Sequence, residues 1–449
     1  MSDIEIAPLT EALLAAAKSA GADAADAIAV DGTSIRIEVL KGALEMAERS
    51  EGVELGLRVM VGKRQACVSA SDIEPATIAE MAERAVAMAR LAPEDPYIGL
   101  AEPEALSSLR DGDALDLVDP GEDPDPAGLE ARALEAEAAA LAVEGISQVS
   151  TAGAGYSRRR IHLSASNGFS GGYARSDHGV FCVAITGEGT GMERDYFGDS
   201  RNHLSDLLPA AEIGRIAAER TVERAGARKP KTGAYPVIYD ERISSALIGH
   251  LLSATNGTSI ARGSSWARDL LGEQVLPSHL SLIEEPHRPR TSGSRPFDAE
   301  GLPTQTRAIV DNGVLTGWTL DLATGRKLGM PSTGNASRGT GGPPSPSVGN
   351  ARLTDGEHSR EDLIAQMGTG LLITSMIGSS INPTTGDYSR GASGFWVENG
   401  EIAYPVNECT VAGNLKDMLL SIVPANDARP HLSRVVPSLL VEGLTIAGA

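Results

Sequence analysis

The sequence TGDYSRGASGFWVENGEI spans residues 385–402 and contains the clearest fold signals of the chain. Its Asn399-Gly400 pair follows an aromatic and apolar run, which is the pattern of a tight hairpin turn between antiparallel strands. Phe395 and Trp396 are conspicuous because aromatic residues make up only 4% of the sequence. The stretch therefore predicts a glycine-kinked strand whose aromatic side chains cap a core.

A second interpretation of the same stretch is a surface where backbone groups lie open to an extended peptide. Glycines allow another backbone to approach closely, and Arg390 offers a permanent cation to a carboxylate. The candidate peptide-binding residues are Gly386, Arg390, Gly391, Ser393 and Gly394. The sequence pattern leaves both interpretations open.

Outward from this stretch, the chain divides into α+β blocks with antiparallel sheets and packed helices. Residues 111–126 contain seven acids, three prolines and no basic residue, which predicts a solvated linker. The predicted organisation is an N-terminal α+β domain at 1–96, an acidic proline-rich linker at 97–127, a middle α+β domain at 128–229 and the largest domain at 230–449.

In the first block, apolar spacing predicts a helix over 8–19, stopped by Gly21, and a second helix over 74–91. Between the two helices, Asp31-Gly32 and Gly52 are predicted to separate short strands. The expected strands are 27–31, 33–40, 53–61 and 64–70.

The middle block is predicted to contain two helices, 129–143 and 209–226, around a set of strands. The expected strands are near 147–156, 159–165, 170–177 and 180–187, with Asn167-Gly168 as a hairpin turn. Gly153-x-Gly155 lacks a complete nucleotide-binding fingerprint and is interpreted as a turn. The last block is expected to begin with a strand from Tyr235 and an apolar helix over 243–254.

The overall charge limits the classes of partner. With 39 Lys and Arg against 60 Asp and Glu, the net charge is −21, so nucleic acids and anionic membranes meet a like charge. The N-terminal sequence has no secretion signal, and no apolar run approaches the ~18–20 residues of a membrane span. The sequence thus predicts a cytoplasmic protein without nucleic-acid or membrane partners. Cys67, Cys182 and Cys409 are expected to be isolated buried thiols.

Hydrolytic motifs are incomplete in this sequence. A zinc hydrolase needs two or three His, Cys or carboxylate ligands and a general base, yet no His-Glu pair occurs. His250 has Ala246 and Ala254 as its neighbours one helical turn away, which indicates a structural histidine. Gly391-Ala-Ser-Gly394 lacks the spacing of a serine-hydrolase elbow.

Several long segments of the sequence resemble signature motifs of the TldD/PmbA family, and specifically of its PmbA branch, also called TldE. They are PFDAEGLPTQ (296–305), RKLGMPSTGNA (326–336), the opening stretch (385–402) and YPVNECTVAGNLKDM (404–418). The resemblance covers most of the chain and is strongest from Pro236 to Gly413. It implies a cytosolic peptide-processing protease in which TldD-type and TldE-type subunits pair and the TldD-type subunit holds the zinc.

The resemblance also implies a zinc helix of the form His-Glu-x-x-x-His in TldD-type chains, together with a cysteine near the C-terminus. The similar helix here has Ser245 and Ala246 in place of the first histidine and the glutamate, and it keeps only His250. The tail has no cysteine, and Val436 lies near the position of that ligand. We therefore expect no metal site and no catalytic residue in this chain, with zinc only in a TldD-type partner.

The function that this resemblance implies is a zinc-free TldE-type subunit that assists a TldD-type protease and helps to form a chamber for unfolded or short peptides. Two alternatives come from other classes. One is an autonomous peptidase with an unrecognised site. The other is a non-enzymatic homodimer that binds peptides.

Overall fold

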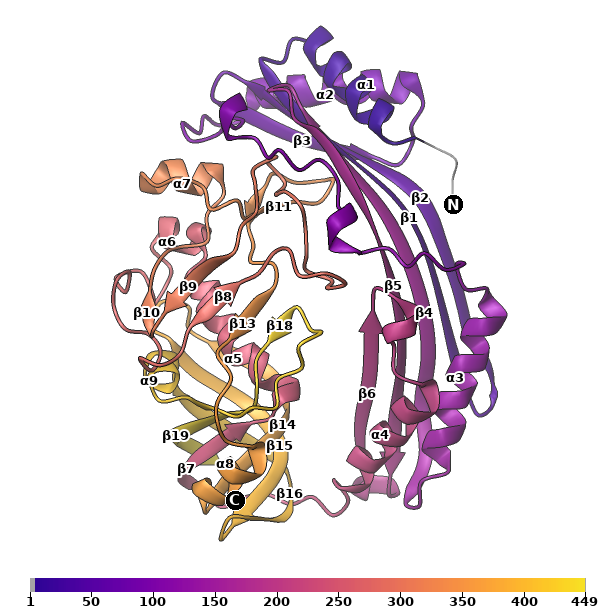
Figure 1. Ribbon diagram of the computed structural model, residues 1–449, viewed down its shortest axis with the longest axis vertical. Coiled ribbons are helices and arrows are strands. Elements are labelled where there is room, and N and C mark those ends of the chain that lie inside the picture. The colour runs from indigo at the N-terminus through magenta and orange to yellow at the C-terminus, as the bar shows by residue number, and fades with distance from the viewer. Residues whose placement is uncertain (1–4, 449) are drawn as a thin grey trace.

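The computed structural model describes residues 5–448, apart from the side chain of residue 379. The molecule has two parts, a long curved sheet with helices on one face and a C-terminal body facing its other side (Figure 1). The α+β class is confirmed, with sheets that are mainly antiparallel.

The long sheet has the strand order β3-β2-β1-β4-β5-β6. Its strands are β1 (Ala24–Leu40), β2 (Ala43–Val61), β3 (Arg64–Ala70), β4 (Ile146–Ala165), β5 (Ser170–Thr186) and β6 (Glu193–Arg201). Because β1 pairs with β4, strands from the predicted first and middle domains lie in one sheet. The predicted domain limits themselves stay a prediction.

The strand breaks predicted at Asp31-Gly32 and Gly52 are wrong. Gly32 and Gly52 lie opposite each other inside β1 and β2, where the ladder continues through both residues. The predicted turn at Gly153-x-Gly155 is also wrong, since both glycines lie in the interior of β4. Pairing with neighbouring strands keeps these glycines extended, on both sides for Gly32, Gly153 and Gly155 and on one side for Gly52. The local sequence does not reveal that pairing. The hairpin turn at Asn167-Gly168 is confirmed, because it joins β4 to β5.

Four helices cover one face of this sheet, because alternate strand residues are apolar on that side. They are α1 (Ala7–Ser19), α2 (Pro75–Leu91), α3 (Pro126–Leu141) and α4 (Ala210–Val222). Leu13 of α1 and Met81 of α2 pack on the alanines and leucines of β1 and β2. Leu129 of α3 and Ile213 of α4 pack on β4 and β5. The concave face is left toward the C-terminal body (Figure 1).

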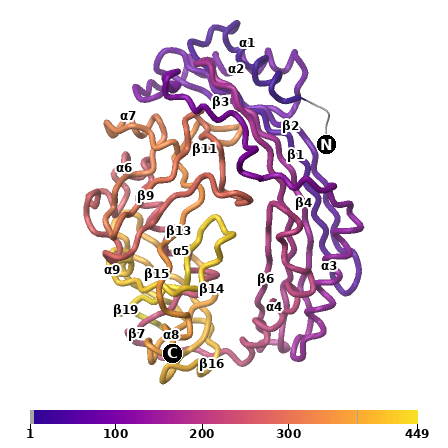
Figure 2. Tube along the Cα trace, viewed as in Figure 1, coloured from indigo at the N-terminus to yellow at the C-terminus, as the bar shows by residue number. Residues whose placement is uncertain are grey.

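The predicted linker crosses the sheet as an ordered strap with two short helical turns (Figure 2). Leu115 and Leu117 are buried, and the amide of Asp119 donates to the hydroxyl of Ser176 on β5. The expectation of a fully solvated linker is therefore wrong. Leu115 and Leu117, within the acidic stretch, supply apolar contacts that its acidic composition did not predict.

The C-terminal body contains a second large sheet of order β16-β15-β14-β7-β19-β17, in which β16 also pairs with β19. That pairing closes β7, β14, β15, β16 and β19 into a ring. The strands are β7 (Gly233–Tyr239), β14 (Gly370–Ile381), β15 (Asp387–Glu398), β16 (Glu401–Asn414), β17 (Val423–Pro424) and β19 (Leu439–Ala447). Asn399 and Gly400 both have positive φ, which confirms the predicted hairpin turn.

Helices α5 (Glu241–Ala254) and α8 (Arg360–Met367) pack on opposite faces of β7, β14 and β15. Trp396 is fully buried in the core shared with Leu247 and Leu251 of α5, whereas Phe395 packs with Leu363 of α8. The prediction that these aromatics hold the strand to the core is confirmed.

Smaller elements complete the body. They are α6 (Gly257–Arg262), α7 (Leu322–Leu328), α9 (Leu415–Leu420), β8 (Leu282–Glu284), β9 (Arg307–Asp311), β10 (Val314–Leu315), β11 (Ala336–Ser337), β12 (Ser345–Pro346), β13 (Ala351–Leu353) and β18 (Arg434–Val435). In the described chain, no helix has both the length and the apolar character needed to cross a bilayer.

Candidate functional site

Helix α5 carries the positions that correspond to a zinc helix. It starts at Asp240, whose side chain caps the helix by accepting the amide of Arg242. The hydroxyl of Ser244 donates to the carbonyl of Val436 at 3.2 Å, so the predicted C-terminal position does lie beside α5. Ser245 and Ala246 are both half-buried on the same helix.

His250 occupies the second half of α5 and packs its ring against Tyr388 of β15, with 5.8 Å between ring centroids. Burial lowers the pKa of His250, and the nearby Arg390 lowers it further. The structure thus brings His250 and Arg390 together from two distant predicted sites. One imidazole beside Ser245 and Ala246 does not fit a zinc ion, which needs three or four ligands. Among the described residues, no group of three His, Cys, Asp or Glu side chains could hold a metal.

The backbone of β15 is paired on both sides, with β14 along one edge and β16 along the other. An extended peptide therefore cannot add to this strand, and that part of the peptide-binding hypothesis is wrong. A Cβ atom at Gly394 would lie 1.9 Å from the carbonyl oxygen of Leu372, and one at Gly391 would lie 2.7 Å from a methyl group of Ile377. These two glycines admit a neighbouring strand of their own sheet.

The other three candidates also have partners within the chain. Arg390 donates through Nε to the carbonyl of Gly378 at 2.8 Å, across the β14–β15 hairpin. Ser393 accepts from Arg224 at 2.9 Å, and the amide of Gly386 donates to the carbonyl of Asn382. A binding role for these side chains stays a prediction.

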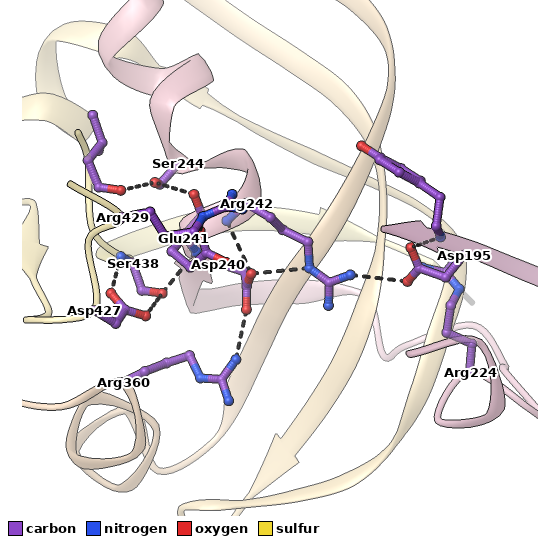
Figure 3. A network of polar contacts seen from close by, with 12 residues as sticks. Asp195, Arg224, Asp240, Glu241, Arg242, Ser244, Arg360, Asp427, Arg429 and Ser438 are labelled. Atoms are coloured by element: carbon purple, nitrogen blue, oxygen red, sulfur yellow. Dashed lines mark hydrogen bonds and ion pairs between the residues drawn. The ribbon is translucent and has the colours of Figure 1, made fainter. Parts of the chain in front are cut away.

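A network of charged groups joins the start of α5 to both parts of the molecule (Figure 3). Arg242 contacts Asp240 and also Asp195 of β6, each at 3.2 Å. Arg360 of α8 reaches the other oxygen of Asp240 at 2.9 Å. Because Asp240 and Asp195 are almost completely buried, the network fixes α5 relative to the long sheet.

The same helix start holds a loop of the C-terminal segment. Glu241 pairs with Arg429 at 2.5 Å, and the amide of Glu241 donates to the hydroxyl of Ser438. Asp427 accepts from both the amide and the hydroxyl of Ser438. These contacts fix residues 427–433 in front of the concave face of the sheet, where the loop appears in yellow beside β18 (Figure 1).

A cavity of about 620 Å³ lies between this loop and the concave face. Strands β1, β4, β5 and β6 form its floor, and segments 290–292 and 429–433 form the opposite wall. Its size falls within the range of about 300–1,000 Å³ typical of ligand pockets.

The ionisable groups of this cavity are mostly tied to one another. Asp199 pairs with Arg201 at 2.9 Å and accepts the amide of Leu208. Burial lowers the pKa of His431 to about 4, with the neighbouring Arg201 acting in the same direction, so its ring is neutral at physiological pH. Burial raises the pKa of Asp177, although the Ser200 hydroxyl, which donates to its carboxylate, acts against that shift. The cavity therefore offers polar contacts and few free charges.

A smaller cavity of about 330 Å³ is lined by residues from two of the family-like segments, 296–305 and 326–336. Asp298 and Glu300 come from the first segment, and Asp298 accepts the amide of Ala336 from the end of the second. Burial raises the pKa of Asp298 to about 6 and that of Glu300 to about 8, the latter also because Asp298 lies beside it. Asp298 also accepts hydrogen bonds from two further backbone amides. These acids therefore hold loops of the C-terminal body in place.

Sequence reasoning missed the residues of the large cavity. They come from strands β1, β4, β5 and β6 and from two separate later segments, 290–292 and 429–433, so no local motif marks them. The one available signal was the Gly153-x-Gly155 pair in an otherwise strand-like run.

Comparison with known proteins places the whole chain. Models of the PmbA/TldA metallopeptidase family match domain 1 at residues 25–89, the central domain at 119–225 and the C-terminal domain at 232–448. The metalloprotease PmbA of Escherichia coli O157:H7 is 37% identical over 99% of this chain and 96% of its own length. A PmbA homolog of Haemophilus influenzae is 36% identical over 96% of this chain and 94% of its own length.

Solved structures share the fold. A Bacteroides thetaiotaomicron protein superposes with a TM-score of 0.90 at 27% identity, covering 98% of both chains. TldE from Thermococcus kodakarensis superposes with a TM-score of 0.85 at 21% identity, covering 98% of this chain and all of its own. With three family domains in order and full-length relatives, this chain belongs to the PmbA/TldD family and, within it, to the PmbA branch.

Proposed function

We propose that this chain is the zinc-free, TldE-type subunit of a cytoplasmic peptide-processing protease. A TldD-type subunit supplies the zinc and the general base, and this chain completes the chamber that holds unfolded or short peptides. The chain itself binds no metal and cleaves no peptide.

The observation that carries this proposal is the composition of α5. Its capped start, its packing and its position beside Val436 provide a frame for a zinc helix, yet the side chains at two of its key positions are Ser245 and Ala246. His250 packs against Tyr388 and lies in the field of Arg390, which disfavours a second cation. A helix that has the fold of a zinc helix but lacks the zinc ligands is what we expect in a subunit that assists a catalytic partner.

The test compares the purified chain with the pair formed by co-expression with a TldD-type subunit. We expect no stoichiometric zinc in the isolated chain by elemental analysis, and cleavage of an unfolded peptide only by the pair. A His250→Ala variant should leave cleavage by the pair unchanged per folded molecule.

Two results would contradict the proposal. Tightly bound zinc at His250 or cleavage by the isolated chain would favour the autonomous peptidase. A stable homodimer that binds peptide but does not associate with a TldD-type subunit would favour the non-enzymatic alternative.

A further inference from the structure

The smaller cavity, of about 330 Å³, lies where the loop after β11 meets the concave face of the long sheet. The loop comes very close to the sheet, because a Cβ at Gly56 of β2 would lie 2.3 Å from the carbonyl oxygen of Thr340. The volume is within the range of about 300–1,000 Å³ typical of small-molecule sites. One wall of the cavity is apolar and consists of Ile28, Val30, Ile161, Leu163 and Phe297.

Arg338 lines this cavity with a side chain that is 0% exposed. Its Nη1 pairs with Asp26, whereas its Nε and Nη2 have no hydrogen-bond partner among the described residues. Nε and Nη2 form one edge of the guanidinium plane, and the parallel N–H groups of that edge match the two oxygens of a carboxylate. Buried donors without partners are costly unless a ligand satisfies them.

The charge beside Arg338 is not balanced within the chain. Asp26 also accepts Nε of Arg58 at 2.7 Å, so one carboxylate serves two buried guanidinium groups. Glu300 acts on Arg58 as well, but burial and the neighbouring Asp298 raise the pKa of Glu300 to about 8, so it is mostly uncharged at pH 7. Asp26 therefore neutralises only one of the two arginines.

Two further arginines line the cavity. Arg295 donates Nη1 and Nη2 to the backbone carbonyls of Ala336 and Ser347, and its buried Nε has no partner. Arg159 of β4 is exposed and forms no ion pair within the described residues, although its charge lowers the pKa of Asp177 in the wall of the larger cavity. Neither arginine is neutralised by a carboxylate in direct contact.

The two acids of the lining already have partners. Glu54 accepts from the hydroxyl of Thr340 at 3.2 Å, and Asp298 accepts three backbone amides. Together with Arg58 and Asp26 behind the wall, four guanidinium groups face three carboxylates. The excess of one positive charge favours an anion in the cavity.

We propose that this cavity binds a small organic carboxylate, whose two oxygens accept from Nε and Nη2 of Arg338 and whose apolar body lies against the wall that contains Ile161 and Phe297. Arg159 and Arg295 add long-range attraction for the negative charge. The apolar wall favours an organic acid over a strongly hydrated inorganic anion such as phosphate. The site is independent of a TldD-type subunit, because all of its residues belong to this chain.

The test titrates 3-phenylpropanoate into the isolated full chain at pH 7 and follows the heat of binding by isothermal titration calorimetry. We expect saturable binding. Two analogues should each bind at least about tenfold more weakly. They are 3-phenylpropanamide, which has the same apolar body without the charge, and acetate, which has the charge without that body.

Substitutions separate the roles of the two arginines. Arg159→Gln should weaken binding about threefold to tenfold and Arg159→Lys should restore it, because Arg159 contributes charge. Arg338→Lys keeps a cation beside Asp26 but loses the two parallel donors, so it should bind at least about tenfold more weakly. The matched control is Arg194→Gln, which changes an exposed arginine on β6 outside the cavity and should bind as wild type does.

Circular dichroism and thermal unfolding without ligand establish that each variant is folded. If Arg338→Lys does not fold, the Arg159 variants and the neutral amide decide the matter. No binding by wild type, or equal binding of 3-phenylpropanamide, would overturn the inference. So would equal affinity of Arg159→Gln and wild type, or phosphate binding as tightly as 3-phenylpropanoate.

Discussion

At the scale of single residues, the most unusual groups are the buried acids Asp298 and Glu300. Both are almost completely removed from solvent, and Glu300 accepts the amide of Leu322 at the start of α7. Arg58 favours the ionised form of Glu300, but burial and the neighbouring Asp298 and Asp321 outweigh it. The folded chain therefore keeps a proton on Glu300 that the unfolded chain releases.

This retained proton makes stability depend on pH. Because the folded pKa of Glu300 is raised from 4.5 to about 8, its contribution is fully present below pH 4.5 and is lost as pH rises toward 8. As the pH rises from 4.5 to above 8, wild type should therefore lose up to about 5 kcal/mol of stability relative to Glu300→Gln, at the scale of 1.36 kcal/mol per pKa unit. Thermal unfolding at several pH values checks this, with Glu45→Gln, an exposed carboxylate on β2, as the control. Parallel pH profiles for wild type and Glu300→Gln would contradict it.

At the scale of elements, the glycines of β15 allow this strand to pack closely against its neighbour β14 because they have no side chains. Its glycines sit where the backbone of β14 comes very close, and its aromatics point to the two cores on either face. The glycines and aromatic residues of β15 therefore have a structural role in the ring of strands of the C-terminal body.

Gly394→Ala tests this role. The added methyl group would overlap the carbonyl oxygen of Leu372, a backbone atom that cannot move without breaking the ladder. We expect a loss of more than about 3 kcal/mol in the free energy of unfolding. Urea unfolding is the measurement, and Gly317→Ala, where a Cβ meets nothing within 4 Å, is the control. A stable Gly394→Ala variant would show that β14 and β15 can separate without cost.

At the scale of the whole molecule, Asp195 is one of the buried charges that join the two parts. Asp195 of the long sheet contacts Arg242 of α5 at 3.2 Å and Arg224 at 3.6 Å. All three side chains are largely buried, so the loss of the carboxylate removes one buried partner from each guanidinium group and leaves Arg242 with Asp240 and Arg224 with Glu193.

Asp195→Ala should therefore weaken the coupling between the two parts. We expect a loss of about 3 kcal/mol and a calorimetric unfolding profile that splits into two transitions. Glu219→Ala, which removes an exposed pair with Arg215 on α4, should cost about 0.5 kcal/mol or less. A single unshifted transition for Asp195→Ala would mean that other contacts, such as the buried pair of Arg338 with Asp26, suffice to couple the two parts.

Local sequence patterns correctly predicted the features that local interactions determine, namely helix limits and tight turns. The limits of α1 and α5 follow from apolar spacing together with Gly21 after α1 and the Asp240 cap before α5. The turn at Asn399-Gly400 follows from the need for positive φ. The union of β1 with β4 could not be predicted, because that pairing joins residues more than a hundred positions apart.

The candidate site divides in the same way. The altered zinc-helix motif around His250 could be identified from the local sequence alone. Arg201 and His431 could not be identified, since each becomes informative only when the long sheet and the loop at 429–433 face each other across a cavity.

The closed ring of the C-terminal body also sets an order of events during synthesis. Thr410, Val411 and Ala412 of β16 meet their partners in β19, which is the last strand of the described chain. The six strands of the long sheet are complete by Arg201 and can pair while the ribosome is still making the second part. The ring cannot close until β19 has emerged, so for much of its synthesis the chain carries a finished sheet and an open set of strands. Until then one edge of β16 stays unpaired, and an unpaired strand edge is a site at which a nascent chain can aggregate.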